Sequence, residues 1–184
     1  MKNKAYDLSS YSFSSNEQVL VDTNVWLYLF PAPTGSLNSG FANQYATAFS
    51  KLVSAQAQPV LDPMVLSEYL NRYIRIEWEG NYKTTYPKFK DFRTSEDFKT
   101  VASAAKTFAQ KILSFCQLHS IPANELDLNQ ALAHFSAGGV DFNDALLVDI
   151  CKKKNLKLMT NDGDFQDGGI KVLTTNPGLL KACP

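Results

Sequence analysis

The sequence predicts an α/β protein in which helices cover both sides of a parallel sheet. Short, branched apolar segments at residues 19–21, 59–61, 156–159 and 170–173 have the composition of buried strands. They alternate with longer segments of helical pattern, an order typical of right-handed β-α-β crossovers. At 184 residues, 45% hydrophobic and 20% charged, the chain is long enough for one domain whose core needs no disulfide.

The N-terminal part of the chain is expected to hold the first strand and two helices. We predict that residues 1–15, which are rich in Ser and Tyr, form a loosely ordered lead-in. The first strand then ends at Asp22, and a helix is predicted at residues 24–30 before a segment with two prolines and a glycine. A further helix is predicted around residues 41–53 from its apolar spacing.

The middle of the chain contains the clearest helix-start signals. An Asp-Pro pair at 62–63 predicts a helix that runs to about residue 80 and carries Glu68 near its second turn. Residues 81–95 are polar and aromatic, so we expect a surface excursion there. A Ser-Glu-Asp start then predicts a long helix over residues 95–118.

The C-terminal part begins with an Ile-Pro break and a short helix at about residues 125–135. After a Gly-Gly break, Asp141 is expected to begin a helix that carries Asp144 in its first turn. The Asn-Asp-Gly-Asp segment at 161–164 predicts a turn between the last two strands.

Four acidic residues at or near the ends of these segments indicate a metal site. Asp22 and Asp162 each follow a predicted strand, while Glu68 and Asp144 lie on helices entered near the same edge of the sheet. In parallel sheets the functional site lies beyond the carboxyl ends of the strands. Clustered carboxylates repel one another unless they are protonated or bind cations. We therefore predict a site for Mg²⁺ or Mn²⁺ and chemistry at a phosphate.

Charge and cysteine content exclude several other classes. Eighteen basic residues balance eighteen acidic ones, so nucleic acid would have to be bound by a local patch. Three widely spaced cysteines without a Cys-x-x-Cys pair argue against a disulfide framework or a structural zinc site. No signal peptide or membrane-spanning segment is evident in the sequence, so we expect a cytoplasmic protein.

The same motifs resemble a known family. Val-Asp-Thr-Asn at 21–24, then Glu68, Asp-Ala-Leu-Leu at 144–147, and Met-Thr-Asn-Asp-Gly-Asp-Phe at 159–165 are similar to the motifs of PIN-domain nucleases, and within them to VapC-type ribonuclease toxins. The resemblance implies a PIN-like three-layer α/β/α sandwich with a small, mainly parallel sheet. Residues 1–184 would form one such domain, with a helical insertion at 81–118.

The resemblance also implies an activity and its partners. It predicts an endoribonuclease, dependent on Mg²⁺ or Mn²⁺, that hydrolyses RNA phosphodiester bonds and leaves 5′-phosphate and 3′-hydroxyl ends. The partners it implies are an RNA substrate, a small antitoxin protein and a second copy of the chain in a homodimer, with no membrane. It assigns catalysis and metal binding to Asp22, Glu68, Asp144 and Asp162, and auxiliary roles to Asn24, Thr160, Asn161, Asp141 and Asp164.

Each assignment has a structural alternative. Asp22 could cap the following helix, and Glu68 could simply pair with Arg72 at the i, i+4 spacing. Asp141 could be the ligand in place of Asp144, although a cap role fits it better. The aspartates of the 161–164 turn could serve only the turn.

Basic residues near the middle of the chain are candidates for RNA binding. We assign this role to Arg72, Arg75, Lys83 and Lys88, with Lys90 and Arg93 nearby. Tyr82, Tyr86 and Phe89 are interleaved with them, and exposed aromatic rings could stack on unpaired bases. The alternative is a solvated insertion with partly packed aromatic rings. We expect structural roles for the histidines, His119 and His134.

Two other functions are open at the level of sequence. A metal-dependent phosphatase of the haloacid-dehalogenase type would use an aspartate after the first strand, but here Asn24 replaces the second Asp of the usual Asp-x-Asp motif. The other is a catalytically inactive PIN-like binding module, although such a module would not need to retain all four acidic positions.

Overall fold

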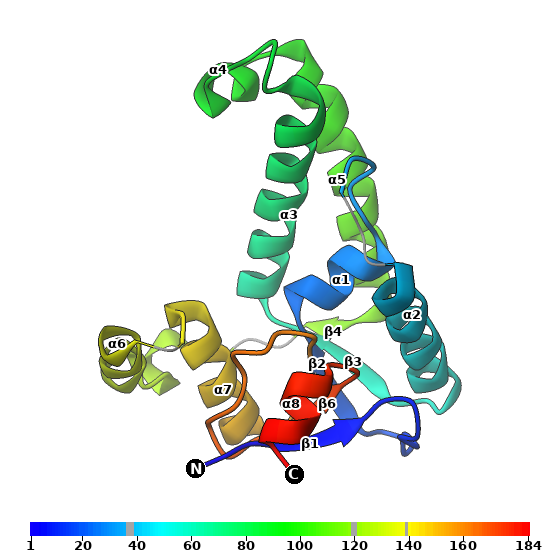
Figure 1. The fold of residues 1–184 in the computed structure, drawn as a ribbon, viewed down its shortest axis with the longest axis vertical. Helices are drawn as coiled ribbons and strands as arrows, with labels where there is room; N and C mark the ends of the chain where they lie inside the picture. Colours follow the sequence, from blue (N-terminus) through cyan, green and yellow to red (C-terminus); the bar gives the residue numbers. More distant parts are fainter. Residues whose placement is uncertain (36–38, 119–120, 139) are drawn as a thin grey trace.

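A six-stranded sheet forms the centre of the computed structural model, which describes residues 1–35, 39–118, 121–138 and 140–184 (Figure 1). The strand order is β1-β6-β5-β2-β3-β4, and every neighbouring pair is parallel. The strands are β1 (Lys4–Asp7), β2 (Gln18–Val21), β3 (Gln58–Leu61), β4 (Gln117–Leu118), β5 (Lys157–Met159) and β6 (Lys171–Thr174). The predicted α/β class with a parallel sheet is therefore confirmed.

Helices lie on both sides of this sheet and beyond its carboxyl edge. They are α1 (Thr23–Leu29), α2 (Ser39–Ser54), α3 (Pro63–Glu77), α4 (Phe89–Arg93), α5 (Glu96–Phe115), α6 (Leu128–Ala137), α7 (Phe142–Lys154) and α8 (Pro177–Ala182). Figure 1 shows α2 and α7 on opposite sides of the sheet, which gives the three layers of the predicted sandwich. No helix within the described ranges combines the length and apolar character needed to cross a membrane.

The N-terminal residues are an ordered part of the fold, so the predicted loose lead-in at 1–15 is wrong. β1 pairs with β6 along its whole length, and the Leu8 side chain is buried. The buried Asn3 amide donates to the Phe165 carbonyl at 3.0 Å, and its oxygen accepts from the Ile170 amide at 2.9 Å. A four-residue edge strand with no long apolar run gives little signal in a sequence.

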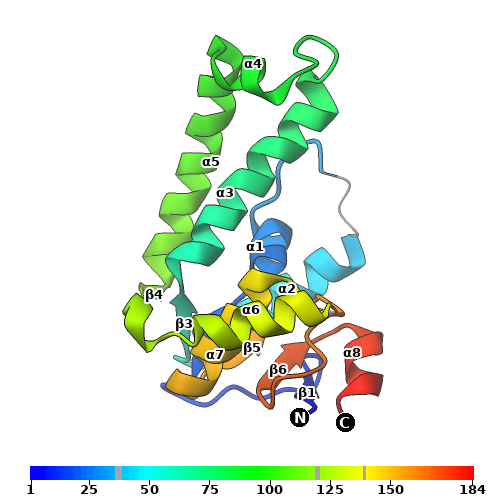
Figure 2. The same cartoon turned by 90° about the vertical axis from the view of Figure 1, so that its left-hand side faces the viewer.

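A helical arm projects from the carboxyl edge of the sheet (Figures 1 and 2). It consists of α3, a π-helical turn at Trp78–Tyr82, α4 and α5. Phe108 on α5 packs against Tyr73 on α3 and against Phe30, which follows α1. Residues 81–118, which the sequence predicts as an insertion, contribute α4, α5 and β4. The sequence predicted that the helix would continue to residue 118, whereas α5 ends at Phe115 and β4 follows it.

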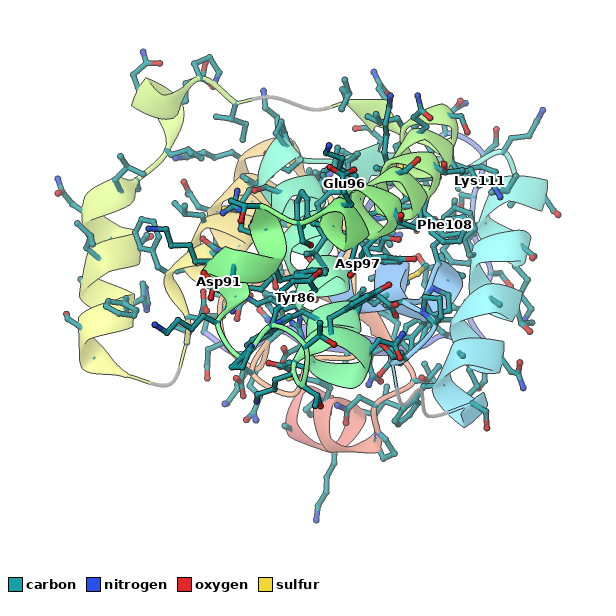
Figure 3. All side chains as sticks on the ribbon, turned by 90° about the horizontal axis from the view of Figure 1, so that it is seen from above. Tyr86, Asp91, Glu96, Asp97, Phe108 and Lys111 are labelled. Atoms are coloured by element: carbon teal, nitrogen blue, oxygen red, sulfur yellow. The ribbon has the colours of Figure 1, made fainter. Side chains whose placement is uncertain are left out.

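The tip of the arm has its own small core, so the predicted surface excursion at 81–95 is wrong in detail. Phe92 is fully buried there. The aromatic rings around it are Tyr82, Tyr86, Phe89 and Phe98. Seen from above (Figure 3), Tyr86 lies next to Asp97, and its hydroxyl donates to the Asp97 carboxylate at 2.8 Å. Tyr82, Tyr86 and Phe89 are half-buried, so these rings fit the alternative of partly packed side chains better than that of exposed stacking platforms.

One largely buried ion pair allows a test of this packing. Lys157 on β5 donates to Glu17 at 2.8 Å and to the Tyr11 hydroxyl at 2.5 Å, and the Glu17 side chain is only 8% exposed. Burial raises the pKa of Glu17, but hydrogen bonds from Lys157, Ser14 and Tyr11 outweigh this effect and lower the pKa.

We expect Lys157→Met to lower the free energy of unfolding by about 2 kcal/mol, because it leaves a desolvated carboxylate without its cation. The measurement is a urea unfolding curve at pH 7. The control is Lys2→Met, which removes an exposed pair with Asp167 and should cost less than about 0.5 kcal/mol. Equal losses in the two variants would contradict a stabilising role for the Lys157 pair.

Candidate active site

The site is centred on Asp22, at the carboxyl end of the central strand β2. Its carboxylate is buried and caps α1 by accepting from the Thr23 amide at 2.6 Å. The other oxygen accepts from the Asn24 amide group at 2.5 Å and from the Thr160 hydroxyl at 2.6 Å. The capping role considered as an alternative is therefore present, and it fixes the direction of the carboxylate towards the edge of the sheet.

Thr160 faces Asp22 because of the register between β2 and β5. Val21 pairs with Met159, so the next residue of each strand meets its neighbour at the sheet edge. Besides donating to Asp22, the Thr160 hydroxyl accepts from the Asn24 amide group at 3.1 Å and from the Asp162 backbone amide at 3.0 Å. One buried hydroxyl thus connects Asp22, Asn24 and the start of the Asp162 turn.

Asp162 is half-buried in the turn after β5, and its carboxylate accepts from the Asp164 amide at 3.0 Å. Asp164 itself is exposed and lines a separate cavity of about 540 Å³ beside α6 and α7. The charge of Asp162, by contrast, is among those that raise the pKa values of both Asp22 and Asp144. Of the two turn aspartates, Asp162 therefore lies with the other acids.

Three residues that the sequence did not single out hold this turn. The buried Tyr45 hydroxyl on α2 donates to the Thr160 carbonyl at 2.8 Å. The Tyr28 hydroxyl accepts from the Asn161 amide group at 3.1 Å, and the Asn176 amide group donates to the Asn161 carbonyl at 2.8 Å. Tyr45 sits on the apolar face of its predicted helix, so the sequence indicates a core residue and gives no sign of its hydroxyl contacts.

Asp144 enters the site from the first turn of α7. Asp141 precedes it as the N-cap and accepts from the Asn143 amide at 2.7 Å, with its side chain exposed. The cap therefore belongs to Asp141, while the half-buried Asp144 lies within electrostatic range of Asp22, Asp162 and Glu68.

Glu68 is the acid supplied by the arm. It lies on α3, half-buried, and forms an ion pair with Arg72 at 3.4 Å, the i, i+4 contact that the sequence offered as an alternative. Its charge nevertheless raises the pKa of both Asp22 and Asp144. Glu68 thus takes part in the ion pair and in the acidic cluster at once.

The electrostatics of the cluster show that the four acids interact. Burial raises the pKa of Asp22 to about 6, although hydrogen bonds from Thr160 and Thr23 act in the opposite direction. Burial, followed by the charges of Asp22, Asp141, Asp162 and Glu68, raises the pKa of Asp144 to about 7. In the metal-free protein the cluster therefore holds protons at a pH where exposed carboxylates have lost them.

These oxygens suit a hard cation such as Mg²⁺, although they do not form a closed cage. Among the described residues, no three Asp, Glu, His or Cys side chains approach closely enough to make a ready-made metal site. The repulsion that raises the two pKa values is the property that a divalent cation would relieve. Mg²⁺ is usually held by one or two carboxylates and several waters, and an open cluster fits that mode of binding.

The raised pKa of Asp144 leads to a pH-dependent stability prediction. Between the ordinary value of 3.8 and about 7, the folded protein binds more protons than the unfolded chain. The contribution of Asp144 to the free energy of unfolding therefore falls as the pH rises through that window. We expect metal-free Asp144→Asn to match the wild type near pH 4 and to be more stable by about 1–2 kcal/mol at pH 8, a figure reduced for partial exposure.

The measurement is the difference in unfolding free energy between wild type and Asp144→Asn from pH 4 to 8, in the presence of chelator. A difference that does not change with pH would contradict the raised pKa.

The candidate RNA-binding residues run from the site along the arm. Arg72 lies beside Glu68, Arg75 holds its guanidinium 4.5 Å from the centre of the Phe89 ring, and Lys83 lies 5.5 Å from Trp78. These three and Lys88 are all exposed. His134 is exposed on α6, outside the acidic cluster, whereas His119 lies outside the described residues.

The parallel sheet and its flanking helices make this an α/β protein. The acidic side chains at the end of the central strand form a site that attracts cations, at the place where such sheets carry their functional sites. A family model described as the PIN domain matches residues 19–171. The chain therefore belongs to the PIN domain family, as its motifs predicted. The comparison with curated protein sequences gives no match.

Solved structures share the fold at low sequence identity. VapBC2 from Rickettsia felis, in a structure bound to a DNA fragment from its promoter, is 16% identical, with a TM-score of 0.53 and coverage of 85% of this chain and 98% of that one. VapC20 from Mycobacterium tuberculosis, described as a Sarcin-Ricin loop cleaving toxin, is 18% identical, with a TM-score of 0.48 and coverage of 80% and 92%. The similarity to the Rickettsia protein supports the PIN fold.

Proposed function

We propose that this protein is an endoribonuclease that hydrolyses RNA phosphodiester bonds with the help of Mg²⁺ or Mn²⁺. The observation that carries the proposal is the convergence of Asp22, Glu68, Asp144 and Asp162 at one edge of the sheet, where their charges act on one another. Membership of the PIN family supports a nuclease over other uses of an acidic cluster.

Under this proposal the chain's own residues hold and orient the reacting groups. Asp22 and Asp144, with Asp162 and Glu68, would hold one or two cations. A bound cation would supply Lewis acidity and lower the pKa of an attacking water. Thr160 and Asn24 keep the Asp22 carboxylate in place through the hydrogen bonds described above. Tight orientation of ligand side chains by such neighbours is common at metal sites.

Cations on the arm would guide the RNA to this edge. Arg72 and Arg75 lie on α3 beyond Glu68, with Lys83 and Lys88 towards the tip, and all four residues are exposed and could meet phosphates. Backbone contacts of this kind add affinity without sequence preference. Arg72 would contact a phosphate next to the acids.

The resemblance to VapC-type proteins extends the proposal to a toxin. A small antitoxin protein would then be the natural partner, and a homodimer and a cytoplasmic location would follow from the same resemblance. The fold shared with VapBC2 of Rickettsia felis is consistent with a toxin.

The phosphatase alternative has less support. Asn24 uses its amide group to donate to Asp22 and to Thr160, so no carboxyl group stands where an acid/base residue would be needed. An inactive binding module would have the same fold, and only an assay separates it from an enzyme.

The test is incubation of the purified protein with end-labelled single-stranded and structured RNA in Mg²⁺, in Mn²⁺ or in chelator, followed by identification of the product ends. We expect cleavage that requires the cation and leaves 5′-phosphate and 3′-hydroxyl ends. Products with 2′,3′-cyclic phosphates would overturn the hydrolytic mechanism, and the absence of cleavage by folded protein with cation would favour the binding module.

A further inference from the structure

A second feature next to the acidic edge is a cavity between α1, residues 34–35, α3 and the π-helical turn. Its volume is about 480 Å³. Asn24, Tyr28 and Arg72 line the end nearest the acids, Leu27 and Ile76 provide apolar wall, and Glu79 and Gly80 line the part formed by the turn. Ligand sites are typically concave, largely apolar and equipped with a few polar groups that orient the ligand.

The wall formed by residues 34–35 is fixed to the arm by a buried carboxylate. Glu77 on α3 is 6% exposed and accepts from the Thr34 amide at 2.8 Å and from the Thr34 hydroxyl at 2.7 Å. Gly80 packs so closely that a Cβ there would lie 2.5 Å from the Thr34 Cβ. These contacts make the cavity part of the folded structure, since the segment cannot move without breaking them.

Three lining residues also belong to the acidic site. Asn24 donates to Asp22, Tyr28 accepts from Asn161, and Arg72 pairs with Glu68. The cavity and the acids therefore share side chains. A substrate whose phosphate is held at the acids would place its neighbouring residue at the mouth of the cavity.

The two ends of the cavity carry opposite charges. Arg72 places a cation at the end near the acids, while Glu79 places a carboxylate on the part formed by the turn. A nucleotide bound here would have its phosphate towards Arg72, its base against Leu27 and Ile76, and an exocyclic amino group towards Glu79. A base inside a duplex cannot enter such a cavity, whereas an unstacked base can.

We propose that this cavity is a subsite for one unpaired nucleotide directly beside the phosphodiester bond that is cut. The inference rests on the proposed ribonuclease function and extends it to the place where one base of the substrate is held. Part of the recognition then comes from a base held outside the metal site, and the acids themselves need no sequence preference.

The test combines a change in the protein with a change in the RNA. An oligonucleotide with a defined cleavage point is made in versions that each lack one base, and single-turnover cleavage rates are measured for wild type and for Ile76→Trp, which fills the cavity. We expect that removing one particular base beside the cut bond lowers the cleavage rate of the wild type at least tenfold. Ile76→Trp should cut the intact RNA at a similarly reduced rate and show no further loss with that abasic RNA.

Two further variants complete the design. Asn71→Trp adds the same ring at an exposed position of α3 outside the cavity, and it should keep the wild-type response to base removal. Glu79→Trp fills the cavity from an exposed position, so it replaces Ile76→Trp if that variant does not fold.

The outcomes separate the two proposals. If the wild type cleaves RNA, but removing the base slows the wild type and every variant by the same factor, the nucleotide subsite is overturned and the ribonuclease proposal stands. Failure of folded wild type to cleave any RNA in the presence of cation would overturn the ribonuclease proposal and the subsite with it.

Discussion

Replacing Asp144 by asparagine is expected to lower the rate of cation-dependent RNA cleavage by on the order of 10³-fold, which exceeds the 10–100-fold typical of residues that only orient a metal ligand. The reason is its place in the cluster, where burial and the charges of three other site acids raise its pKa to about 7. The substitution keeps the size of the side chain and removes the charge that a cation would neutralise. The measurement is the single-turnover rate at saturating protein in Mg²⁺ and in Mn²⁺.

The matched control is Asp7→Asn. Asp7 also lies at the carboxyl end of a parallel strand, but on the edge strand β1, where it accepts from the Ser9 amide at 2.8 Å. Unlike Asp22 and Asp144, Asp7 is exposed. We expect a rate within about twofold of wild type for this variant. A folded Asp144→Asn protein with the rate of the control would refute a catalytic role for the cluster.

Thr160→Val should have the second largest effect, because it removes one buried hydroxyl that contacts Asp22, Asn24 and the Asp162 amide. We expect cleavage to fall about 10–100-fold, as for residues that orient a metal ligand. The free energy of unfolding should fall by about 1–3 kcal/mol, because a buried carboxylate and an amide lose their partner. Valine has nearly the same shape, so packing is retained.

Thr23→Val provides the comparison for this variant. Thr23 is also buried and adjacent to Asp22, but among the residues that the structure describes its hydroxyl donates only to the Val65 carbonyl, at a long 3.4 Å. We expect less than threefold loss of cleavage and a stability change below about 1 kcal/mol. If both threonine variants lost activity equally, general disturbance of the site would explain the Thr160 effect, and the orienting role would have to be abandoned.

The acidic site could be anticipated from sequence because it depends on simple rules. Asp22 and Asp162 follow apolar strands, and parallel strands bring their carboxyl ends to one edge. Asp141 has the sequence position of an N-cap, which leaves Asp144 to face the site. Strand and helix positions alone therefore place these acids near one another.

Other parts depend on contacts that no local pattern encodes. β1 is an ordered strand because it lies beside β6, where each paired residue is 167 positions away in the chain, and its short sequence carries no signal of that pairing. The hydroxyl of Tyr45 reaches Thr160 only after α2 packs on the sheet. At the tip of the arm, the aromatic residues considered for stacking on RNA surround Phe92, since burying their rings stabilises the arm.

The most direct measurement is a crystal structure of the wild-type protein soaked with Mn²⁺, with the ion located from its anomalous scattering. If Mn²⁺ binds at the strand ends, we expect an anomalous peak within coordination distance of Asp22, Asp144 or Asp162. That peak should be lost in Asp144→Asn crystals prepared in the same way. Cleavage-competent crystals without any Mn²⁺ peak at these carboxylates would contradict the assignment of the acidic edge as the metal centre.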